Sequence, residues 1–212
     1  MVRLDLHVHT SASFDCRVAP ARILARARRV GLTAVAITDH DTLDGARSLS
    51  GLRPGAFIPG EEVATRDGEL IGLFLSEPIP SGLDAQEAVR RIKDQGGLVY
   101  LEHPYDTRRR CLSEDAIELL ADSIDIVEVF NGRSTTDANH RAGDLCATLG
   151  TAPGVGSDAH TLEEIGSCYV EIEPFATAQG FLSNLRQGTV VLHPNRLRLM
   201  AAGGLARLTR RT

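Results

Sequence analysis

The length, composition and charge of this chain are those of an ordinary globular protein and exclude several classes. The chain has 212 residues, of which 42% are hydrophobic and 24% charged, so it can fold as one domain with a substantial core. Its net charge of −5 argues against binding to duplex nucleic acid. No apolar run reaches the roughly 18 residues that a membrane helix needs, so we expect no membrane span and no membrane partner.

Four cysteines are spread widely over the chain, at positions Cys16, Cys111, Cys146 and Cys168. They form no Cys-x-x-Cys pair, which argues against a disulfide framework and against a structural zinc site. A reducing compartment fits this pattern. Because a functional-looking motif starts at residue 5, removal of a signal peptide would destroy it, and we therefore expect a cytoplasmic protein.

Strand-like and helix-like segments alternate along the chain, which predicts a parallel α/β architecture. The expected strands cover residues 3–7, 33–38, 56–58, 69–75, 98–101, 125–130, 151–156, 168–172 and 189–192. The expected helices cover residues 20–30, 42–49, 84–95, 113–122, 135–149 and 177–187. We expect one domain over residues 1–202, followed by a loosely held Gly- and Arg-rich tail over residues 203–212.

Two short motifs near the two ends of the chain have the spacing of metal ligands. One is Asp5-Leu6-His7-Val8-His9, and the other is Gly156-Ser157-Asp158-Ala159-His160. Each motif places two side chains that can bind a metal at positions i and i+2. On a β-strand these positions point to the same face, so each motif aims two ligands at one point.

Three further motifs also follow apolar, strand-like runs: Thr38-Asp39-His40-Asp41, Gly60-Glu61-Glu62 and Glu102-His103-Pro104. The five motifs together hold five of the seven histidines, each near a carboxylate. Ligands repeated at strand ends favour a barrel with its active site at the carboxyl ends of the strands. Imidazole and carboxylate without thiolate suit Zn²⁺, Mn²⁺ or Fe²⁺, and the sequence does not choose among these metals.

These motifs resemble those of the polymerase and histidinol phosphatase (PHP) superfamily of metal-dependent phosphoesterases, and they occur in the family's order over nearly the whole chain. The matching segments are Asp5-Leu6-His7-Val8-His9-Thr10, Ile37-Thr38-Asp39-His40-Asp41-Thr42, Pro59-Gly60-Glu61-Glu62, Glu102-His103-Pro104 and Gly156-Ser157-Asp158-Ala159-His160. The resemblance implies an α/β fold of the PHP type, a distorted (β/α)7 barrel. It also implies two to three divalent metal ions in a cleft at the carboxyl ends of the strands.

The same resemblance implies which residues bind the metals. It assigns one metal to His7, His9, Glu62 and Asp158, a second to Glu62 and His103, and a third to Asp15, His40 and His160. In many relatives a histidine three residues before a glycine in the fourth strand completes the second site. Here that position is Glu69. Glu61 is the other candidate there, but on an extended strand it faces away from Glu62, so Glu62 is favoured.

The charge of such a centre indicates its substrate. Four expected ligands are carboxylates and supply −4, namely Asp15, Glu62, Glu69 and Asp158. Three divalent ions supply +6 and leave a net charge of +2, whereas two ions leave the centre neutral. A trinuclear centre therefore attracts a phosphomonoester dianion. We expect His7, His9, Asp158 and His160 to serve catalysis by a metal-activated hydroxide that attacks phosphorus in line.

Several arginines follow the strand-end motifs and are candidates for binding the phosphate. They are Arg17, the run Arg108-Arg109-Arg110, of which Arg109 is our candidate, and Arg133, which lies beside the further candidate Asn131. His193 is either a surface residue or part of the substrate pocket, and His140 is expected to be structural. There is no Gly-x-Ser-x-Gly elbow and no Walker loop, which argues against acyl transfer and nucleotide-driven work.

Three functions stay open from the sequence. The first is a phosphatase for a small nucleotide or sugar-type phosphate, with histidinol phosphate less favoured because the loops around the second strand are short. The second is a phosphodiesterase or exonuclease on oligonucleotides, and the third is a metal-stabilised regulatory module without catalysis. Aromatic residues make up only 4% of the chain, too few for a long nucleic-acid track. One ring among Phe14, Tyr105 and Phe130 can still stack on a small substrate. The sequence leaves the oligomeric state open.

Overall fold

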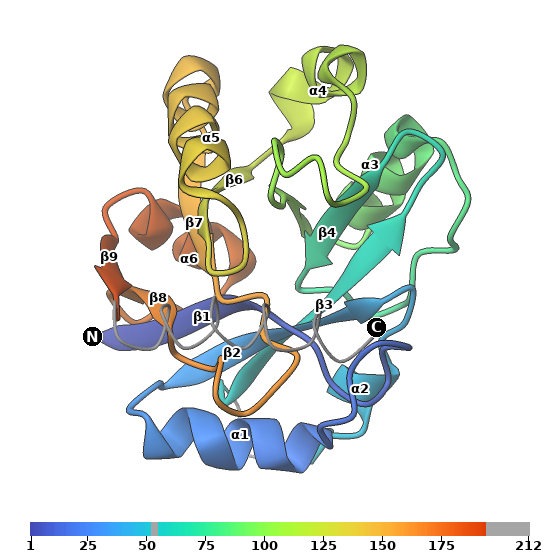
Figure 1. Ribbon diagram of the computed structural model, residues 1–212. Coiled ribbons are helices and arrows are strands. Elements are labelled where there is room, and N and C mark those ends of the chain that lie inside the picture. The colour runs from blue at the N-terminus through green and yellow to red at the C-terminus, as the bar shows by residue number, and fades with distance from the viewer. Residues whose placement is uncertain (52–54, 194–212) are drawn as a thin grey trace, which may run out of the picture.

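A mixed sheet of nine strands curls into a nearly closed barrel in the part of the chain that the structure, a computed structural model, describes (Figure 1). The described residues are 1–51 and 55–193. The strands are β1 (Val2–Val8), β2 (Ala34–His40), β3 (Phe57–Ala64), β4 (Glu69–Leu73), β5 (Leu98–Leu101), β6 (Ile126–Asn131), β7 (Ala152–Gly156), β8 (Cys168–Ile172) and β9 (Thr189–Leu192). The predicted domain end at residue 202 and the predicted tail lie outside the described residues.

Helices separate most of these strands and pack on the outside of the sheet (Figure 1). They are α1 (Pro20–Arg29), α2 (Asp44–Arg47), α3 (Ala85–Asp94), α4 (Glu114–Leu120) with the short 3-10 helix η1 (Ala121–Ser123), α5 (Thr136–Leu149) and α6 (Ala178–Leu185). Helices α3, α4 and α5 are capped at their N-termini, where the side chains of Asp84, Ser113 and Thr135 each accept a hydrogen bond from a backbone N–H in the first turn. Among the described residues, no helix has the length and apolar character needed to cross a membrane.

The sheet order is β7-β6-β5-β4-β3-β2-β1-β8-β9, so β1 to β7 form the predicted seven-stranded barrel in chain order. The expectation of a wholly parallel sheet is wrong, because β3–β4, β4–β5, β1–β8 and β8–β9 pair antiparallel. The link from β3 to β4 spans only residues 65–68, too short for the crossover that a parallel pair requires. The reversed β4 therefore presents its first residue, Glu69, at the end of the barrel where β3 finishes.

The barrel closes where β1 meets β7. Val8 forms a parallel bridge with Ala159, and the backbone N–H of His9 donates to the Ala159 carbonyl at 3.0 Å. Asp5 strengthens this seam by accepting hydrogen bonds from the backbone N–H and the hydroxyl of Ser157. The closure brings the first and the last motif of the sequence side by side.

Alternation along the strands fills the barrel with apolar side chains and then, toward one end, with polar ones. Leu4 and Leu6 belong to the interior cluster, together with residues from β2 to β8. The register of β1 shifts by one residue between Asp5 and Val8, which is a β-bulge. Because a bulge reverses the alternation, His7 and His9 follow Leu4 and Leu6 on the inner face, and the polar end of the barrel begins there.

Candidate metal centre

Histidines and carboxylates gather at the end of the barrel where β1, β2, β3, β5 and β7 finish. The structure places them in four overlapping groups, and within each group the ligand atoms lie within 4.8 Å of one another. The groups are His7–His9–Glu62, His7–His103–Asp158, His9–Asp15–His40–His160 and Glu62–Glu102–His103. Eight of the nine ligands expected from the sequence belong to these groups, and Glu69 does not.

The first group surrounds the two histidines of β1. Nε2 of His7 lies 3.1 Å from Nε2 of His9 and 3.2 Å from Oε2 of Glu62. Oδ1 of Asp158 lies 3.9 Å from Nε2 of His7 and 3.5 Å from Nε2 of His9. All four side chains are buried. Glu62 of β3 and Asp158 after β7 thus both face the two histidines of β1.

The second nitrogen of each of these histidines is held by the protein. Nδ1 of His7 lies 3.2 Å from Oε1 of the buried Glu128, which leaves Nε2 facing the group. Nδ1 of His9 lies 3.1 Å from the hydroxyl of Ser13, and that hydroxyl donates to Asp39 at 2.8 Å. Carboxylates behind an imidazole fix its tautomer and orientation and increase its basicity as a ligand.

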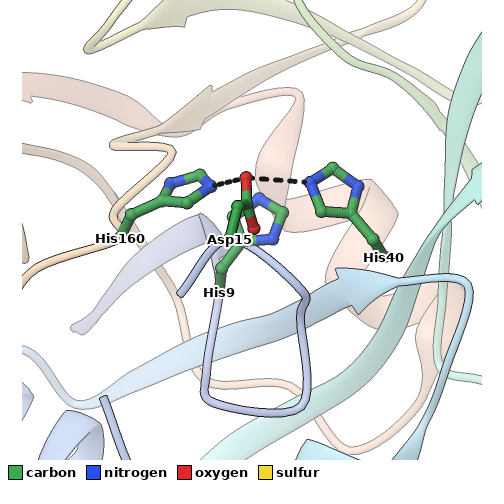
Figure 2. Close-up of side chains that lie close together, drawn as sticks. All are labelled: His9, Asp15, His40 and His160. Atoms are coloured by element: carbon green, nitrogen blue, oxygen red, sulfur yellow. Dashed lines mark hydrogen bonds and ion pairs between the residues drawn. The ribbon is translucent and has the colours of Figure 1, made fainter. Parts of the chain in front are cut away.

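A second group joins the loop after β1 to the ends of β2 and β7 (Figure 2). Oδ2 of Asp15 lies 2.8 Å from Nε2 of His160 and 3.5 Å from Nε2 of His40. Figure 2 shows Asp15 between these two rings, with His9 beside it. The ring of His9 stacks on that of His160 with 4.2 Å between centroids, so His9 belongs to both groups.

Glu62 faces two groups with its two oxygens. Its Oε2 lies 3.2 Å from Nε2 of His9, whereas its Oε1 lies 3.4 Å from Nε2 of His103. A carboxylate in this position can bridge two cations. Glu61 points to the other side of β3, where its Oε2 accepts a hydrogen bond from the backbone N–H of Ile79.

Two of the clustered residues have an unusual backbone. His103 has a φ of 29° and Asp158 a φ of 54°, both in the left-handed region. Such conformations are uncommon outside glycine, cost about 1–3 kcal/mol each and cluster at functional sites. Both residues lie just after a strand, where this turn of the backbone directs the side chain into the centre.

Unpaired polar atoms test whether these residues fit a metal ion. Oδ1 of Asp158 and Nε2 of His103 are buried and make no hydrogen bond. Buried polar atoms are almost always paired, because leaving one unpaired costs about 1–3 kcal/mol. Both atoms point at neighbouring ligand atoms, so divalent cations bound among them would satisfy both. The residues fit the metals that the sequence implies.

The electrostatics of the centre also favour cations. Burial alone lowers the pKa of His9, but the nearby carboxylates of Asp158 and Glu62 outweigh this effect and raise that pKa to about 9. Burial raises the pKa of Asp158, but the neighbouring positive charges, first that of His7, outweigh it and hold this pKa well below its usual range. Asp158 therefore stays ionised and attracts positive charge.

Family comparisons agree with this geometry. The profile of the PHP domain matches residues 5–99, and that of the PHP-associated region matches residues 136–190. The chain belongs to the PHP family. It is 38% identical over 176 residues to the uncharacterized protein MJ0417 of Methanocaldococcus jannaschii, a match that covers 80% of this chain and 70% of that protein.

Solved structures show the same fold. PsfC from Pseudomonas syringae PB-5123 aligns with a TM-score of 0.73 at 22% identity and covers 99% of both chains. A two-domain protein from Bacteroides vulgatus that contains a predicted PHP-like metal-dependent phosphoesterase aligns with a TM-score of 0.71 at 21% identity. That match covers 91% of this chain and 65% of the other chain.

Two of the predicted arginines reach the metal centre of this PHP chain. Nη2 of Arg109 donates to Oδ2 of Asp158 at 2.6 Å. Because the unpaired oxygen of Asp158 is Oδ1, Arg109 leaves the cation-facing oxygen free. Nη1 of Arg133 lies 2.6 Å from Nδ1 of His160. Arg108 instead pairs with Asp106.

The remaining predicted contacts with substrate lie in different surroundings. Arg17 is exposed on the loop after β1. The amide of Asn131 is buried and donates to Glu128, while its oxygen accepts from the backbone N–H of Arg133, so its polar groups are already engaged. His193 is exposed, with its ring against Tyr169 on the β8–β9 hairpin. The substrate roles of these three residues stay predictions.

Sequence reasoning missed the residues that hold the ligands in place. Glu128 and Asp5 are fully buried, and each accepts several hydrogen bonds. In the sequence Glu102 stands out only as part of a motif, although in the structure it forms a ligand group with Glu62 and His103. All three are acidic residues inside or directly after an apolar strand-like run. That position is rare for an acid and is the signal that could have found them.

Proposed function

We propose that this protein is a metal-dependent phosphoesterase that hydrolyses a small phosphomonoester. The observation that carries the proposal is the convergence of the ligand groups with two guanidinium groups, those of Arg109 and Arg133, at the same end of the barrel. Divalent ions supply two things to such a reaction, a water molecule of lowered pKa and neutralisation of phosphate charge. Everything else must come from this chain.

The arginines can bind and orient the phosphate. Arg109 uses Nη2 for Asp158, and its side chain is 23% exposed, so its fork has further N–H groups with which to bind a phosphate. Arg133 lies next to His160 on the other side of Asp158. A planar guanidinium recognises phosphate oxygens with two parallel hydrogen bonds. Two of them beside the ligand groups favour an anionic substrate that carries a terminal phosphate.

An exposed aromatic ring supports the choice of a substrate with a ring. Phe14 is 87% exposed, and its ring stacks on His40 with 4.8 Å between centroids. Tyr105 is less available, because Arg141 covers its ring at 3.9 Å. Phe14 therefore offers a stacking surface next to the ligand group of Asp15. A nucleoside monophosphate matches this pairing of phosphate and ring better than a substrate without a ring.

The test is metal reconstitution followed by two substrate panels. The protein is stripped with a chelator, loaded with Mn²⁺, Zn²⁺ or Fe²⁺, and assayed on phosphomonoesters and on phosphodiesters including short oligonucleotides. Metal-dependent cleavage of monoesters supports the proposal. Cleavage of diesters alone replaces it by a nuclease-type function, and metal binding without any hydrolysis replaces it by a regulatory module.

A further inference from the structure

Glu102 is a buried carboxylate for which the protein provides no hydrogen-bonding partner. It follows β5 directly and is 0% exposed. Neither of its two oxygens makes a hydrogen bond. A carboxyl group in this state is costly whether it is ionised or protonated, because burial removes water from both of its oxygens. Such a group is expected only where something else occupies its oxygens.

Strand geometry directs this carboxylate into the barrel. Leu98 and Tyr100 of β5 both belong to the interior cluster, and Glu102 continues the same alternation. His103 then adopts its left-handed backbone, which turns a second consecutive side chain toward the same space. Two successive residues thus supply ligand atoms to one group, which a regular strand cannot do.

The neighbours of Glu102 have unpaired atoms as well. Its carboxylate lies within 4.8 Å of ligand atoms of Glu62 and His103. Nε2 of His103 is also without a hydrogen bond, and it lies 3.4 Å from Oε1 of Glu62. Two carboxylates and one imidazole thus face one another with three polar atoms unpaired, two on Glu102 and one on His103. A divalent cation would serve all of them at once.

We propose that Glu102 is a metal ligand and that Glu62, Glu102 and His103 form the second cation site. This inference rests on the metal dependence in the proposed function. In this assignment Glu102 takes the place of Glu69, the residue that the resemblance assigns to the second site. Glu69 is only half-buried, and its carboxylate belongs to none of the ligand groups among the described residues. With two carboxylates and a single imidazole, this site suits Mn²⁺ or Fe²⁺ better than a site built of histidines would.

Metal counting in two variants tests the assignment. Metal-free wild type, Glu102→Gln and the matched control Glu69→Gln are titrated with Mn²⁺ by calorimetry. We expect Glu102→Gln to lose one equivalent of Mn²⁺ or to bind it at least about tenfold more weakly, since loss of a mere supporting residue already has that effect. Glu69→Gln should bind like the wild type. Wild-type stoichiometry and affinity in Glu102→Gln would overturn the proposal.

Two further measurements show whether a loss of Mn²⁺ binding comes from the site itself and not from misfolding. Metal-free Glu102→Gln should unfold at the same temperature as the metal-free wild type, because the substitution breaks no hydrogen bond. Crystals of the Mn²⁺-loaded wild type give a reading without any mutation: an anomalous peak at coordination distance from Glu102 supports the proposal, and a peak held by Glu62, His103 and Glu69 alone overturns it. Neither reading depends on substrate, so a protein that binds Mn²⁺ through Glu102 but cleaves no phosphomonoester refutes only the proposed function.

Discussion

Two buried carboxylates on neighbouring strands of the barrel have opposite surroundings. Glu128 in β6 accepts hydrogen bonds from the hydroxyl of Tyr100, the backbone N–H of His103 and the amide of Asn131, and it faces Nδ1 of His7. Glu102, at the end of β5, accepts none. Both are 0% exposed. Glu128 thus holds neighbouring groups in place through its hydrogen bonds, whereas Glu102 has both oxygens available to bind a cation.

The same difference runs through the whole centre. Asp39 and Asp5 resemble Glu128, because each receives several hydrogen bonds and supports a ligand-bearing segment. Asp158 is intermediate, with Oδ2 engaged by Arg109 and Oδ1 unpaired. The kind of partner thus sorts the acids of this site: supports accept from backbone N–H and hydroxyl groups, whereas Glu62 and Asp15 pair with histidines of the ligand groups. Residue type and burial alone do not separate them.

The strongest test of this division removes expected metal ligands around His7. His9→Ala and Asp158→Ala should each lower turnover about a thousandfold or more, since metal ions contribute several kcal/mol to the transition state. Far-ultraviolet circular dichroism should stay close to that of the wild type. The measurements are kcat on the best monoester and metal content by elemental analysis. Wild-type activity in both variants, with a confirmed loss of metal, would refute a metal-based mechanism.

A second test removes a support. Glu128→Gln should weaken metal binding or activity by about 10- to 100-fold, the usual effect of losing a residue that orients a ligand. It should also destabilise the metal-free protein by about 1–3 kcal/mol, because donors around it lose their carboxylate partner. Denaturant unfolding of the metal-free protein measures this loss of unfolding free energy, and Glu102→Gln is the matched variant. Equal stability of the two metal-free variants would contradict the division into supports and ligands.

Much of the centre could be predicted from the sequence because its geometry is local. His7 and His9 lie two residues apart at the end of β1 and reach one ligand group, as the same-face spacing of a strand predicts. Asp158 and His160 have the same spacing but reach different groups, because Asp158 has a left-handed backbone. The strands and helices followed from apolar runs with Pro and Gly at helix ends. Their bounds agree with the structure within two residues, except that β3 extends six residues beyond its expected end. Closure of the barrel between β1 and β7 then joined the two motifs.

The rest depends on contacts between distant segments. The β4 reversal follows from a four-residue link, residues 65–68, and it puts Glu69 at the site without bringing its carboxylate into a ligand group. Glu128 looks like an isolated acid in an apolar strand until His7, far away in the chain, is seen beside it. Whether a buried acid is hydrogen-bonded is a property of its neighbours in space. No single-sequence pattern encodes it.

A third test asks whether a group at the edge of the centre acts on the substrate rather than on the metals. Arg133→Ala should raise KM or lower kcat, with a loss of about tenfold in kcat/KM, since hydrogen bonds to charged groups contribute about 1.5–3 kcal/mol. Metal content should not change. Arg28→Ala is the control, at an exposed arginine of α1 that is no candidate for phosphate binding. An unchanged kcat/KM on every phosphorylated substrate would remove Arg133 from phosphate binding.

The smallest effect is expected at Phe14, which belongs to neither class of acid but borders the ligand group that Asp15, His40 and His160 form. Its exposed ring can stack on a base at a gain of about 1 kcal/mol, so Phe14→Ala should lower kcat/KM for a nucleoside monophosphate about fivefold. A sugar phosphate has no aromatic base to stack, and its kcat/KM should stay within about twofold. Phe14→Tyr, which keeps the ring, should restore the nucleotide preference. Equal losses of kcat/KM on both substrates would mean that Phe14 acts through His40 on the ligand group. Phe14 would then belong to the metal centre and not to a separate substrate-binding edge.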